Sequence, residues 1–312
     1  MHNLLIVDNQ AETYLKELNN HQPRNLEIFV ATNPKEAEDC ITDVNIILGR
    51  PDMVAQLLPK AEKLAWVQST FAGVDALCKQ HLRKDYRLTG VKGIFGPLMS
   101  EYVAGYILAF ERQLFEIKYN QSEQVWKEVT YRSLANLTIG IAGLGSIGLH
   151  VAKTADHFGM NVIGLKRSPG QVEHIAKLFT LDQIDTFLSL VDYLVLLLPD
   201  TPETNKIINK KRLKNMKPGS VIINVGRGAT IDQDDLVWAL QSKTIKGAVL
   251  DVFEEEPLPQ SSPIWKLPNV HVTPHIAATS FPHQVIDIFT ANLHNFETGQ
   301  PLKFLIDFQK GY

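Results

Sequence analysis

Three kinds of polar side chain in the second half of the sequence could together reduce a carbonyl group. Arg227 lies in an Asn-Val-Gly-Arg-Gly segment, His275 follows Thr-Pro, and carboxylates stand at Glu254, Glu255 and Glu256. A guanidinium can grip a carboxylate and polarise a carbonyl oxygen. An imidazole whose pKa is raised by a neighbouring carboxylate could protonate that oxygen. Reduction of a 2-oxo acid by hydride requires such a cation for the substrate carboxylate and such a proton donor for the carbonyl oxygen. Each residue alone, however, could be an ordinary loop residue.

A glycine-rich loop stands earlier in the chain, where a dinucleotide could be held. It consists of Gly143, Leu144, Gly145, Ser146, Ile147 and Gly148. The loop follows a predicted buried strand over residues 137–142 and precedes a predicted helix over residues 149–158. Gly143 permits the tight turn, Gly145 lets the backbone approach a pyrophosphate, and Gly148 lets helix and strand pack closely. This context favours phosphate binding at a helix N-terminus over a purely structural turn.

A short basic segment, Lys166, Arg167 and Ser168, follows the next predicted strand. An acidic residue at this place, about 20 residues beyond the loop, would hold the ribose 2′-hydroxyl of NAD. Two cations and a hydroxyl suit a 2′-phosphate instead, which a carboxylate would repel. We therefore predict that NADP(H) is preferred and that NAD(H) is possible. The alternative is a solvated basic turn without a ligand.

Length and composition predict a globular chain of two domains. The 312 residues exceed the size at which a single core keeps growing, and 45% are hydrophobic. Lys and Arg number 31 against 34 Asp and Glu, without a long run of one sign, so nucleic-acid binding is not expected. Cys40 and Cys78 are too few for a disulfide framework or a zinc site, which fits a reducing cytoplasm and predicts no metal. The apolar run over residues 102–110 is far short of the roughly 20 residues that span a bilayer, so no membrane partner is expected.

Short apolar runs alternate with helix-length segments, which is typical of βαβ units and parallel sheets. Five strands are predicted at residues 4–7, 28–30, 46–48, 64–68 and 87–89. Six more are predicted at residues 138–142, 161–165, 193–198, 221–225, 248–252 and 270–272. Ser100 is the predicted N-cap of a long helix that runs to about Tyr119, and another helix is predicted over residues 285–298. The uncharged residues 102–110 carry more apolar surface than one core-facing stripe needs, which predicts either a homodimer or a fully buried helix.

The glycine loop, Arg227 and His275 resemble the D-isomer-specific 2-hydroxyacid dehydrogenase family in their order and in the residues around them, most strongly over residues 134–302. The resemblance implies that the carboxylate paired with His275 is Glu256, immediately before a proline. It also implies that Asp251 lies near the nicotinamide carboxamide, although a helix cap is an equal alternative.

The resemblance extends to the first part of the chain. Gly73 and Val74, in Phe-Ala-Gly-Val-Asp, resemble the family loop whose backbone N–H groups receive the substrate carboxylate. The implied fold is α/β, with two Rossmann-like domains. A doubly wound parallel-sheet nucleotide-binding domain would span residues 99–282, and a smaller flavodoxin-like substrate-binding domain would combine residues 1–98 and 283–312. The family also uses the apolar helix region for pairing, which implies a homodimer.

Residues 99–102 and the helix around them are more similar to the glyoxylate and hydroxypyruvate reductase branch than to the phosphoglycerate branch. The resemblance therefore implies reduction of a small 2-oxo acid, such as glyoxylate or hydroxypyruvate, to a D-2-hydroxy acid. An NAD-dependent D-lactate or phosphoglycerate dehydrogenase is a rival interpretation, which the lysine at position 166 disfavours. A nucleotide-sensing corepressor on the same fold would retain the same motifs and stays open as an alternative.

Overall fold

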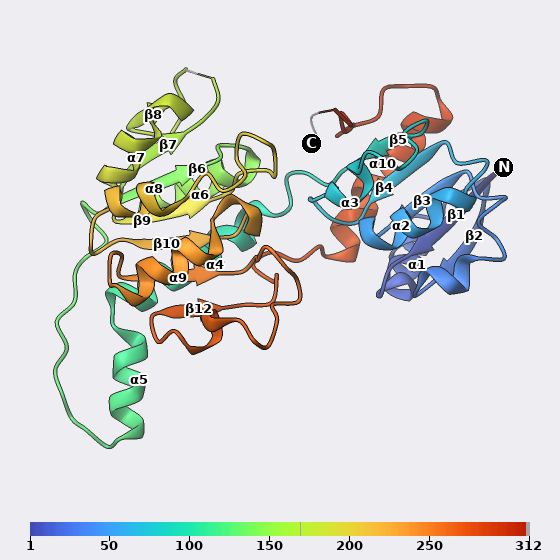
Figure 1. Cartoon of the computed structure of the whole chain (residues 1–312). Helices are drawn as coiled ribbons and strands as arrows, with labels where there is room; N and C mark the ends of the chain where they lie inside the picture. The colour runs from blue at the N-terminus through green and yellow to red at the C-terminus, as the bar shows by residue number, and fades with distance from the viewer. Residues whose placement is uncertain (169, 310–312) are drawn as a thin grey trace. The chain divides into compact units, whose positions relative to one another are not determined.

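The computed structural model describes residues 1–168 and 170–309, and the chain divides into two compact units. Unit 1 combines Met1–Ile94 with Ser280–Tyr312, and unit 2 is Phe95–Thr279 (Figure 1). The chain passes from one unit to the other at two places, and each lies just before a helix whose first turn contains a proline, Pro97 in one case and Pro282 in the other. Among the described helices, none is long and apolar enough to cross a bilayer.

Unit 1 is built on a five-stranded parallel sheet in the order β2-β1-β3-β4-β5. The strands are β1 (His2–Val7), β2 (Leu26–Ala31), β3 (Ile46–Gly49), β4 (Trp66–Ser69) and β5 (Arg87–Thr89). The helices are α1 (Ala11–Asn20), α2 (Pro51–Leu57), α3 (Asp75–Cys78) and α10 (Pro282–Glu297), with 3-10 turns at Pro34–Ala37 and Leu58–Lys60. Strands β3 and β4 are buried along their whole length, as central strands covered on both faces are. The strand order is flavodoxin-like, which confirms the predicted fold of this unit.

Helix α10 brings the end of the chain into the core of unit 1. Phe289 is fully buried and stacks on Trp66 of β4, with ring centroids 5.2 Å apart. Asn292 donates from Nδ2 to Oε1 of the buried Gln68 at 3.2 Å. Unit 1 is therefore discontinuous in sequence, and its core is complete only with these late residues.

Unit 2 contains a seven-stranded parallel sheet in the order β12-β11-β10-β9-β6-β7-β8. The strands are β6 (Thr138–Ala142), β7 (Asn161–Leu165), β8 (Lys177–Phe179), β9 (Tyr193–Leu196), β10 (Val221–Asn224), β11 (Gly247–Leu250) and β12 (Val270–Val272). The first strand, β6, lies between β7 and β9, so the strand order reverses beside it. This reversal of strand order confirms the predicted Rossmann-type architecture. In doubly wound folds, ligands bind at such a reversal. The prediction of six strands was wrong: β8 is a three-residue edge strand with one buried side chain, too short to stand out in the sequence.

The helices of unit 2 differ most from the sequence prediction between residues 96 and 122, and the helix predicted over residues 149–158 begins earlier, at Ser146. They are α4 (Gly96–Glu111), α5 (Leu114–Ser122), α6 (Ser146–His157), α7 (Ile184–Leu190), α8 (Lys210–Asn215) and α9 (Gln233–Gln241), with 3-10 turns at Leu181–Gln183, Gly228–Thr230 and Pro263–Lys266. The predicted helix from an N-cap at Ser100 to about Tyr119 is instead two helices. Gly96 and Pro97 begin α4 one turn earlier, because proline is favoured in a first turn. Gln113 takes a left-handed φ of 54°, which ends one helix and starts the next.

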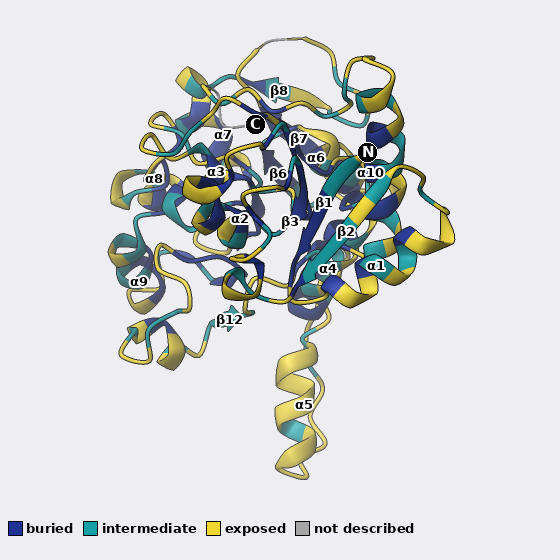
Figure 2. Ribbon diagram, turned by 90° about the vertical axis from the view of Figure 1, so that its right-hand side faces the viewer, coloured by how far each residue is buried: buried dark blue, intermediate teal, exposed yellow. Residues whose placement is uncertain are grey.

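Helix α5 and the segment after it form an arm, residues 112–131, that projects from unit 2 (Figure 2). At the base of the arm, Phe115 stacks on His271 of β12, with ring centroids 3.9 Å apart. None of the α5 side chains is buried. Phe115 is 43% exposed and Trp126 is fully exposed. A nine-residue helix without buried side chains has little to stabilise it in water, because isolated helices need roughly 12 residues or more.

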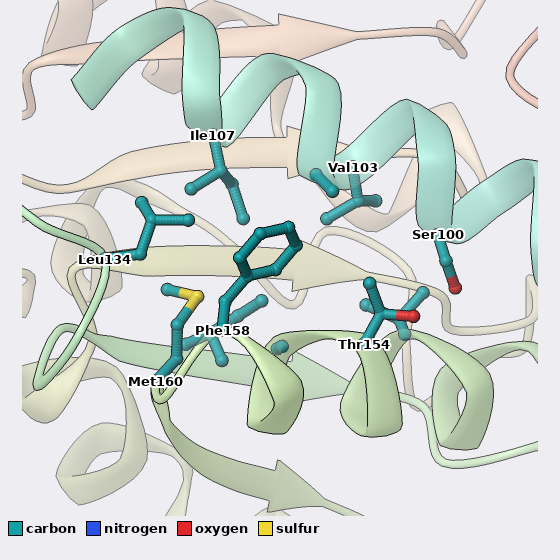
Figure 3. Close-up of a pocket in the computed structure, with 11 residues that line it drawn as sticks. Ser100, Val103, Ile107, Leu134, Thr154, Phe158 and Met160 are labelled. Atoms are coloured by element: carbon teal, nitrogen blue, oxygen red, sulfur yellow. The ribbon is translucent and has the colours of Figure 1, made fainter. Parts of the chain in front are cut away.

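Ser100 lies on the buried face of α4, where α4 packs against α6. A small apolar pocket separates the two helices and is lined by Val103, Ile107, Phe158 and Met160 (Figure 3). At its edge Ser100 Oγ lies 2.7 Å from Nδ1 of His150 on α6. Ser100 therefore joins two helices and does not cap one.

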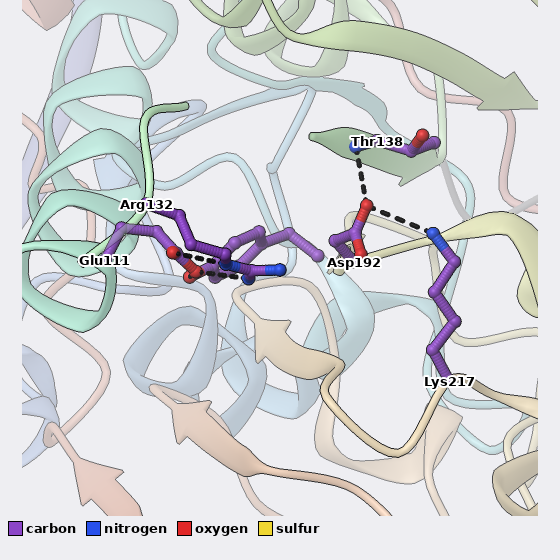
Figure 4. Close-up of polar contacts among 6 residues, drawn as sticks. Glu111, Arg132, Thr138, Asp192 and Lys217 are labelled. Atoms are coloured by element: carbon purple, nitrogen blue, oxygen red, sulfur yellow. Dashed lines mark hydrogen bonds and ion pairs between the residues drawn. The ribbon is translucent and has the colours of Figure 1, made fainter. Parts of the chain in front are cut away.

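An ion pair between the buried carboxylate of Glu111 and the half-exposed guanidinium of Arg132 links the two ends of the arm (Figure 4). Glu111, the last residue of α4, is 2% exposed, and Arg132 follows the arm. Arg132 donates from Nε and Nη2 to the two carboxylate oxygens of Glu111, at 2.9 and 2.7 Å. The hydroxyl of Tyr193, on β9, donates to Glu111 Oε1 at 2.6 Å. The carboxylate is thus fully paired, and the base of the arm is tied to the central sheet.

Candidate active site

The glycine loop lies between the end of β6 and the start of α6, at the reversal of strand order. Gly143 has a φ of +106°, and a Cβ there would lie 2.5 Å from the carbonyl oxygen of Leu197. A Cβ on Gly148 would lie 2.1 Å from the carbonyl oxygen of Gly143. A Cβ on Gly145, in contrast, would meet no atom within 4 Å. The outer two glycines are therefore required by packing, whereas the middle one borders open space.

This open space fits the pyrophosphate of a dinucleotide. The first N–H groups of α6, at Ser146, Ile147 and Gly148, lack acceptors within the helix, and the helix dipole adds positive potential there. Ser146 is exposed and Ile147 is half-buried against the core, so it is chiefly backbone that faces the space. An anion beside Gly145 would satisfy these donors.

The basic segment follows β7, the neighbour of β6 in the sheet. Lys166, Arg167 and Ser168 are all exposed. The Lys166 N–H donates to the carbonyl of Phe179 on β8 at 3.0 Å, which fixes the backbone but leaves the side chain in solvent. An Nη of Arg167 lies 4.0 Å from a carboxylate oxygen of Glu203, and both side chains are more than half exposed. Such a pair is weak and leaves Arg167 available to another anion.

Arg227 follows β10 and is positioned by the glycine after it. A Cβ on Gly228 would lie 1.9 Å from the carbonyl carbon of Phe253, so the two backbone segments are in direct contact. Asn224 donates from Nδ2 to the Arg227 carbonyl at 3.1 Å and fixes the turn from the other side. The Arg227 charge adds to the lowering of the pKa of Glu256 and partly opposes the rise in the pKa of His275, so the guanidinium lies near both groups. The structure therefore brings the three predicted catalytic residues together.

His275 and Glu256 form a hydrogen-bonded pair. His275 Nδ1 lies 2.8 Å from Oε2 of Glu256, and Oε1 of the same carboxylate accepts the Phe253 N–H at 3.0 Å. The carboxylate is thus held at both oxygens, and the imidazole is held through Nδ1. The other ring nitrogen, Nε2, is left to face a ligand, because about half of the His275 side chain is exposed.

The contact between the two side chains changes both pKa values in the direction that favours a protonated His275 and an ionised Glu256. The hydrogen bond to Glu256 raises the pKa of His275 above its usual value, against the opposing effect of burial. Burial favours the neutral form of Glu256, but the hydrogen bonds from His275 and the Phe253 N–H outweigh it and lower the pKa of that carboxyl. His275 therefore holds a proton more firmly than a free imidazole, as a general acid near neutral pH must.

Asp251, at the end of β11, organises the loop that carries His275. Its side chain is 2% exposed and accepts the N–H groups of Ile276 and Ala277 at 2.8 and 2.9 Å. The loop from residue 273 to 281 is not helical, so the alternative that Asp251 caps a helix is wrong. Its contact with a nicotinamide stays a prediction. Sequence reasoning missed Thr273, which donates to Asp251 Oδ1 at 2.5 Å, because no motif marks it apart from the Thr-Pro-His segment itself.

Gly73 and Val74 lie in unit 1, in the loop between β4 and α3. Val74 is 2% exposed, so only its backbone could meet a ligand. Ser69 stabilises the loop, since its Oγ accepts the Phe71 N–H at 3.0 Å and donates to the Phe71 carbonyl at 2.7 Å. The binding of a substrate carboxylate by Gly73 and Val74 stays a prediction.

Comparison with known proteins identifies the family. Residues 104–277 match the family model of the D-isomer specific 2-hydroxyacid dehydrogenase, NAD binding domain. A glyoxylate/hydroxypyruvate reductase A from Serratia proteamaculans is 36% identical over 266 residues, which are 82% of this chain and 84% of the relative. A D-isomer specific 2-hydroxyacid dehydrogenase family protein from Aeromonas salmonicida has a similar structure, with a TM-score of 0.95, 42% identity, and coverage of 98% of this chain and 99% of the other.

The NADPH-dependent glyoxylate/hydroxypyruvate reductase of Sinorhizobium meliloti, solved in complex with NADP and sulfate, is also similar. Its TM-score is 0.91 at 28% identity, and the match covers 100% of both chains. The present chain therefore belongs to the D-isomer specific 2-hydroxyacid dehydrogenase family. It is an NAD(P)-dependent oxidoreductase that interconverts a 2-oxo acid and a 2-hydroxy acid.

Proposed function

We propose that this enzyme uses NADPH to reduce a small 2-oxo acid of the glyoxylate or hydroxypyruvate type to a D-2-hydroxy acid. The observation that carries the proposal is the His275–Glu256 pair at 2.8 Å, with Arg227 close enough to influence both pKa values. Relatives named as glyoxylate/hydroxypyruvate reductases support this choice of substrate.

In the proposed mechanism, the charge of Arg227 polarises the ketone and binds the substrate carboxylate. The N–H groups of Gly73 and Val74 also bind that carboxylate. His275, charged and held through Nδ1, donates the proton on Nε2 to the ketone oxygen. Glu256 stabilises the imidazolium before transfer and keeps the ring in place. Bound NADPH supplies the hydride.

The preference for NADPH rests on the basic segment after β7. Lys166, Arg167 and Ser168 are exposed and offer two positive charges and a hydroxyl at the position where ribose specificity is set. The Sinorhizobium meliloti structure contains NADP, which agrees with this assignment. We also propose that Gly143, Gly145 and the first turn of α6 bind the pyrophosphate, and that Asp251 lies near the nicotinamide.

The test is a panel of 2-oxo acids assayed with NADPH and NADH. We expect the highest kcat/KM with glyoxylate or hydroxypyruvate and NADPH. The His275→Ala variant should lose about 10²- to 10⁴-fold in kcat and retain its affinity for NADPH, as expected when a general acid is removed. An Arg227→Ala variant should mainly raise KM for the 2-oxo acid. A protein that binds NADPH but reduces no member of the panel would instead favour a nucleotide-sensing corepressor.

We further propose that the enzyme is a homodimer whose partner covers the arm. The arm exposes Leu114, Phe115, Ile117, Tyr119 and Trp126. A large apolar surface on a helix with no buried side chain is typical of an interface. Sedimentation at micromolar concentration should give a dimer, and a Phe115→Asp, Trp126→Asp double variant should give a monomer. A wild-type monomer would contradict the proposal.

The compartment we propose is the cytoplasm. Cys40 and Cys78 are free thiols, both half-buried, and a reducing compartment keeps thiols in that state. Fractionation of expressing cells, with recovery of NADPH-dependent activity in the cytosolic fraction, is the measurement that checks this.

A further inference from the structure

His275 is held in a backbone conformation that it would not adopt unaided. Its φ is +55°, in the left-handed region, which is unfavourable for a residue with a Cβ. The His275 N–H donates to the carbonyl of Asp251 at 2.9 Å and to the carbonyl of Thr273 at 3.1 Å. The conformation therefore depends on contacts with neighbouring segments.

The Asp251 carboxylate supplies the rest of this support. It accepts the N–H groups of the next two residues, Ile276 and Ala277, one on each oxygen. Three successive N–H groups of the loop, at residues 275–277, are thus bound to a single aspartate through its backbone and its side chain. Since Asp251 is buried, any rotation of its side chain would move the loop that carries the imidazole.

A chain of two hydroxyls fixes the Asp251 side chain from the opposite direction. Thr273 Oγ1 lies 2.5 Å from Asp251 Oδ1 and 2.6 Å from the hydroxyl oxygen of Tyr102 on α4. Thr273 donates in the contact with Asp251, so its single hydroxyl proton points to the Asp251 carboxyl group. The Tyr102 hydroxyl must then donate to Thr273, and the chain has one direction, from Tyr102 through Thr273 to Asp251.

Tyr102 is well suited to stay a donor in a fixed place. Burial raises the pKa of its hydroxyl above the usual range, so the group stays protonated near neutral pH. Its ring packs against the ring of Tyr106 one turn along α4, with centroids 4.9 Å apart. Tyr106 in turn lies beside His271 on β12, with centroids 5.8 Å apart.

We propose that Tyr102 and Thr273 are positioning residues for His275, which act through Asp251 to hold the imidazole where it can meet Glu256 and the substrate. Neither side chain touches the reacting atoms in this proposal. It rests on the proposed function of His275 as the proton donor. It assigns a role to α4, a helix outside the sequence motifs, and to a threonine in the Thr-Pro-His segment.

The test uses Tyr102→Phe, Thr273→Val and the conservative variant Thr273→Ser. Tyr102→Phe keeps the ring contact with Tyr106 and removes only the donor, so we expect kcat to fall about 3- to 10-fold. Thr273→Val breaks both links, and we expect a loss of about 10- to 100-fold, the range caused by displacement of a catalytic group by up to about 1 Å. Thr273→Ser keeps the hydroxyl and should retain most of the wild-type activity. KM for NADPH should stay within about twofold in all three, and Thr13→Val, which removes an exposed hydroxyl in unit 1, is the matched control for Thr273→Val.

A second measurement does not depend on turnover. The His275 imidazole is titrated by NMR in the cofactor-free protein, and its pKa should fall in Tyr102→Phe and Thr273→Val as the ring moves away from Glu256. An unchanged kcat and an unchanged His275 pKa in both variants would overturn the positioning role, as would a loss of thermal stability alone. If the wild-type protein reduces no 2-oxo acid, the proposed function fails. The NMR titration then still decides whether the hydroxyl chain positions His275.

Discussion

Gly228 lies so close to Phe253 that a single added carbon would occupy the position of the Phe253 carbonyl group, 1.9 Å from its carbon and 2.0 Å from its oxygen. This contact joins the turn of Arg227 to the turn of Glu256, since Phe253 also donates its N–H to the Glu256 carboxylate. Two of the catalytic side chains are therefore placed relative to each other by backbone packing at a glycine.

A Gly228→Ala variant should lose most of its activity, because either Arg227 or the turn of Glu256 must move. We expect a stability loss of about 1–3 kcal/mol, typical of overpacking. The control is Gly219→Ala, where a Cβ meets no atom within 4 Å, and which should behave like the wild type. Steady-state kinetics and thermal unfolding of both variants check the prediction, and full activity in Gly228→Ala would disprove the contact.

The pH dependence of reduction should move when Glu256 loses its charge. His275 must be protonated to act, so kcat/KM for reduction is full below its raised pKa and falls as pH rises through it. Because the hydrogen bond to Glu256 is the largest cause of that raised pKa, Glu256→Gln should shift the alkaline limb of the profile to lower pH. Glu255→Gln, one residue earlier, should leave the limb in place. If the alkaline limb of the kcat/KM profile lies at the same pH in Glu256→Gln and in the wild type, a group other than His275 controls it.

The two glycines at the start of α6 should respond differently to alanine. Gly145→Ala meets no atom of the protein, so we expect an unchanged Tm and an affinity for NADPH that falls about tenfold or more. Gly148→Ala places a methyl group 2.1 Å from the Gly143 carbonyl oxygen and should lower Tm. Thermal unfolding without cofactor and fluorescence titration with NADPH separate the two effects. Equal affinity in Gly145→Ala and wild type would remove this loop from the cofactor site.

The choice between NADPH and NADH should depend on Arg167. One hydrogen bond to a charged group contributes about 1.5–3 kcal/mol, less when exposed, so we expect a wild-type preference for NADPH of at least about tenfold. Arg167→Ala should weaken NADPH use more than NADH use, and Lys166→Asp should reverse more of the preference. Glu203→Gln removes the weak competitor of Arg167 and should leave NADH kinetics unchanged. Equal kcat/KM for both cofactors in the wild type would refute the assignment.

The Glu111–Arg132 pair should stabilise the fold in a pH-dependent way. Burial opposes ionisation of Glu111, but the bonds from Arg132 and Tyr193 outweigh it, and its pKa is lowered. This stabilisation is present above the pKa of an unfolded glutamate, about 4.3, and is lost as pH falls through the lowered pKa. Arg132→Ala should therefore cost about 1–3 kcal/mol at neutral pH and less in acid.

The matched control for this prediction is Lys127→Ala, which breaks an exposed pair with Glu116. It should cost less than about 1 kcal/mol, as exposed ion pairs do. Urea unfolding of the two variants and the wild type at several pH values gives the comparison. A similar cost for both variants, independent of pH, would show that burial of Glu111 adds nothing.

The sequence predicted the parts of this structure that depend on neighbouring residues. The bounds of β6, β7 and β12 follow from continuous apolar runs, and the glycine loop was recognisable because a strand and a helix flank it. The break at Gln113 was not predictable, because a left-handed glutamine has no local signature. The roles of Thr273 and Tyr102 depend on the meeting of β11, β12 and α4, which are far apart in the chain and whose register only the folded structure sets.

The place of Phe289 in the core of unit 1 has a consequence for how the enzyme is made. During synthesis the chain emerges from the N-terminus, so Trp66 leaves the ribosome more than 200 residues before its stacking partner. Unit 2, which ends at Thr279, has all of its sequence available earlier than unit 1 does. We therefore expect unit 2 to fold first. Until α10 is synthesised, the first ninety-four residues expose the hydrophobic face that α10 later covers. In a truncated nascent chain that lacks residues 280–312, that face is the part a chaperone would bind.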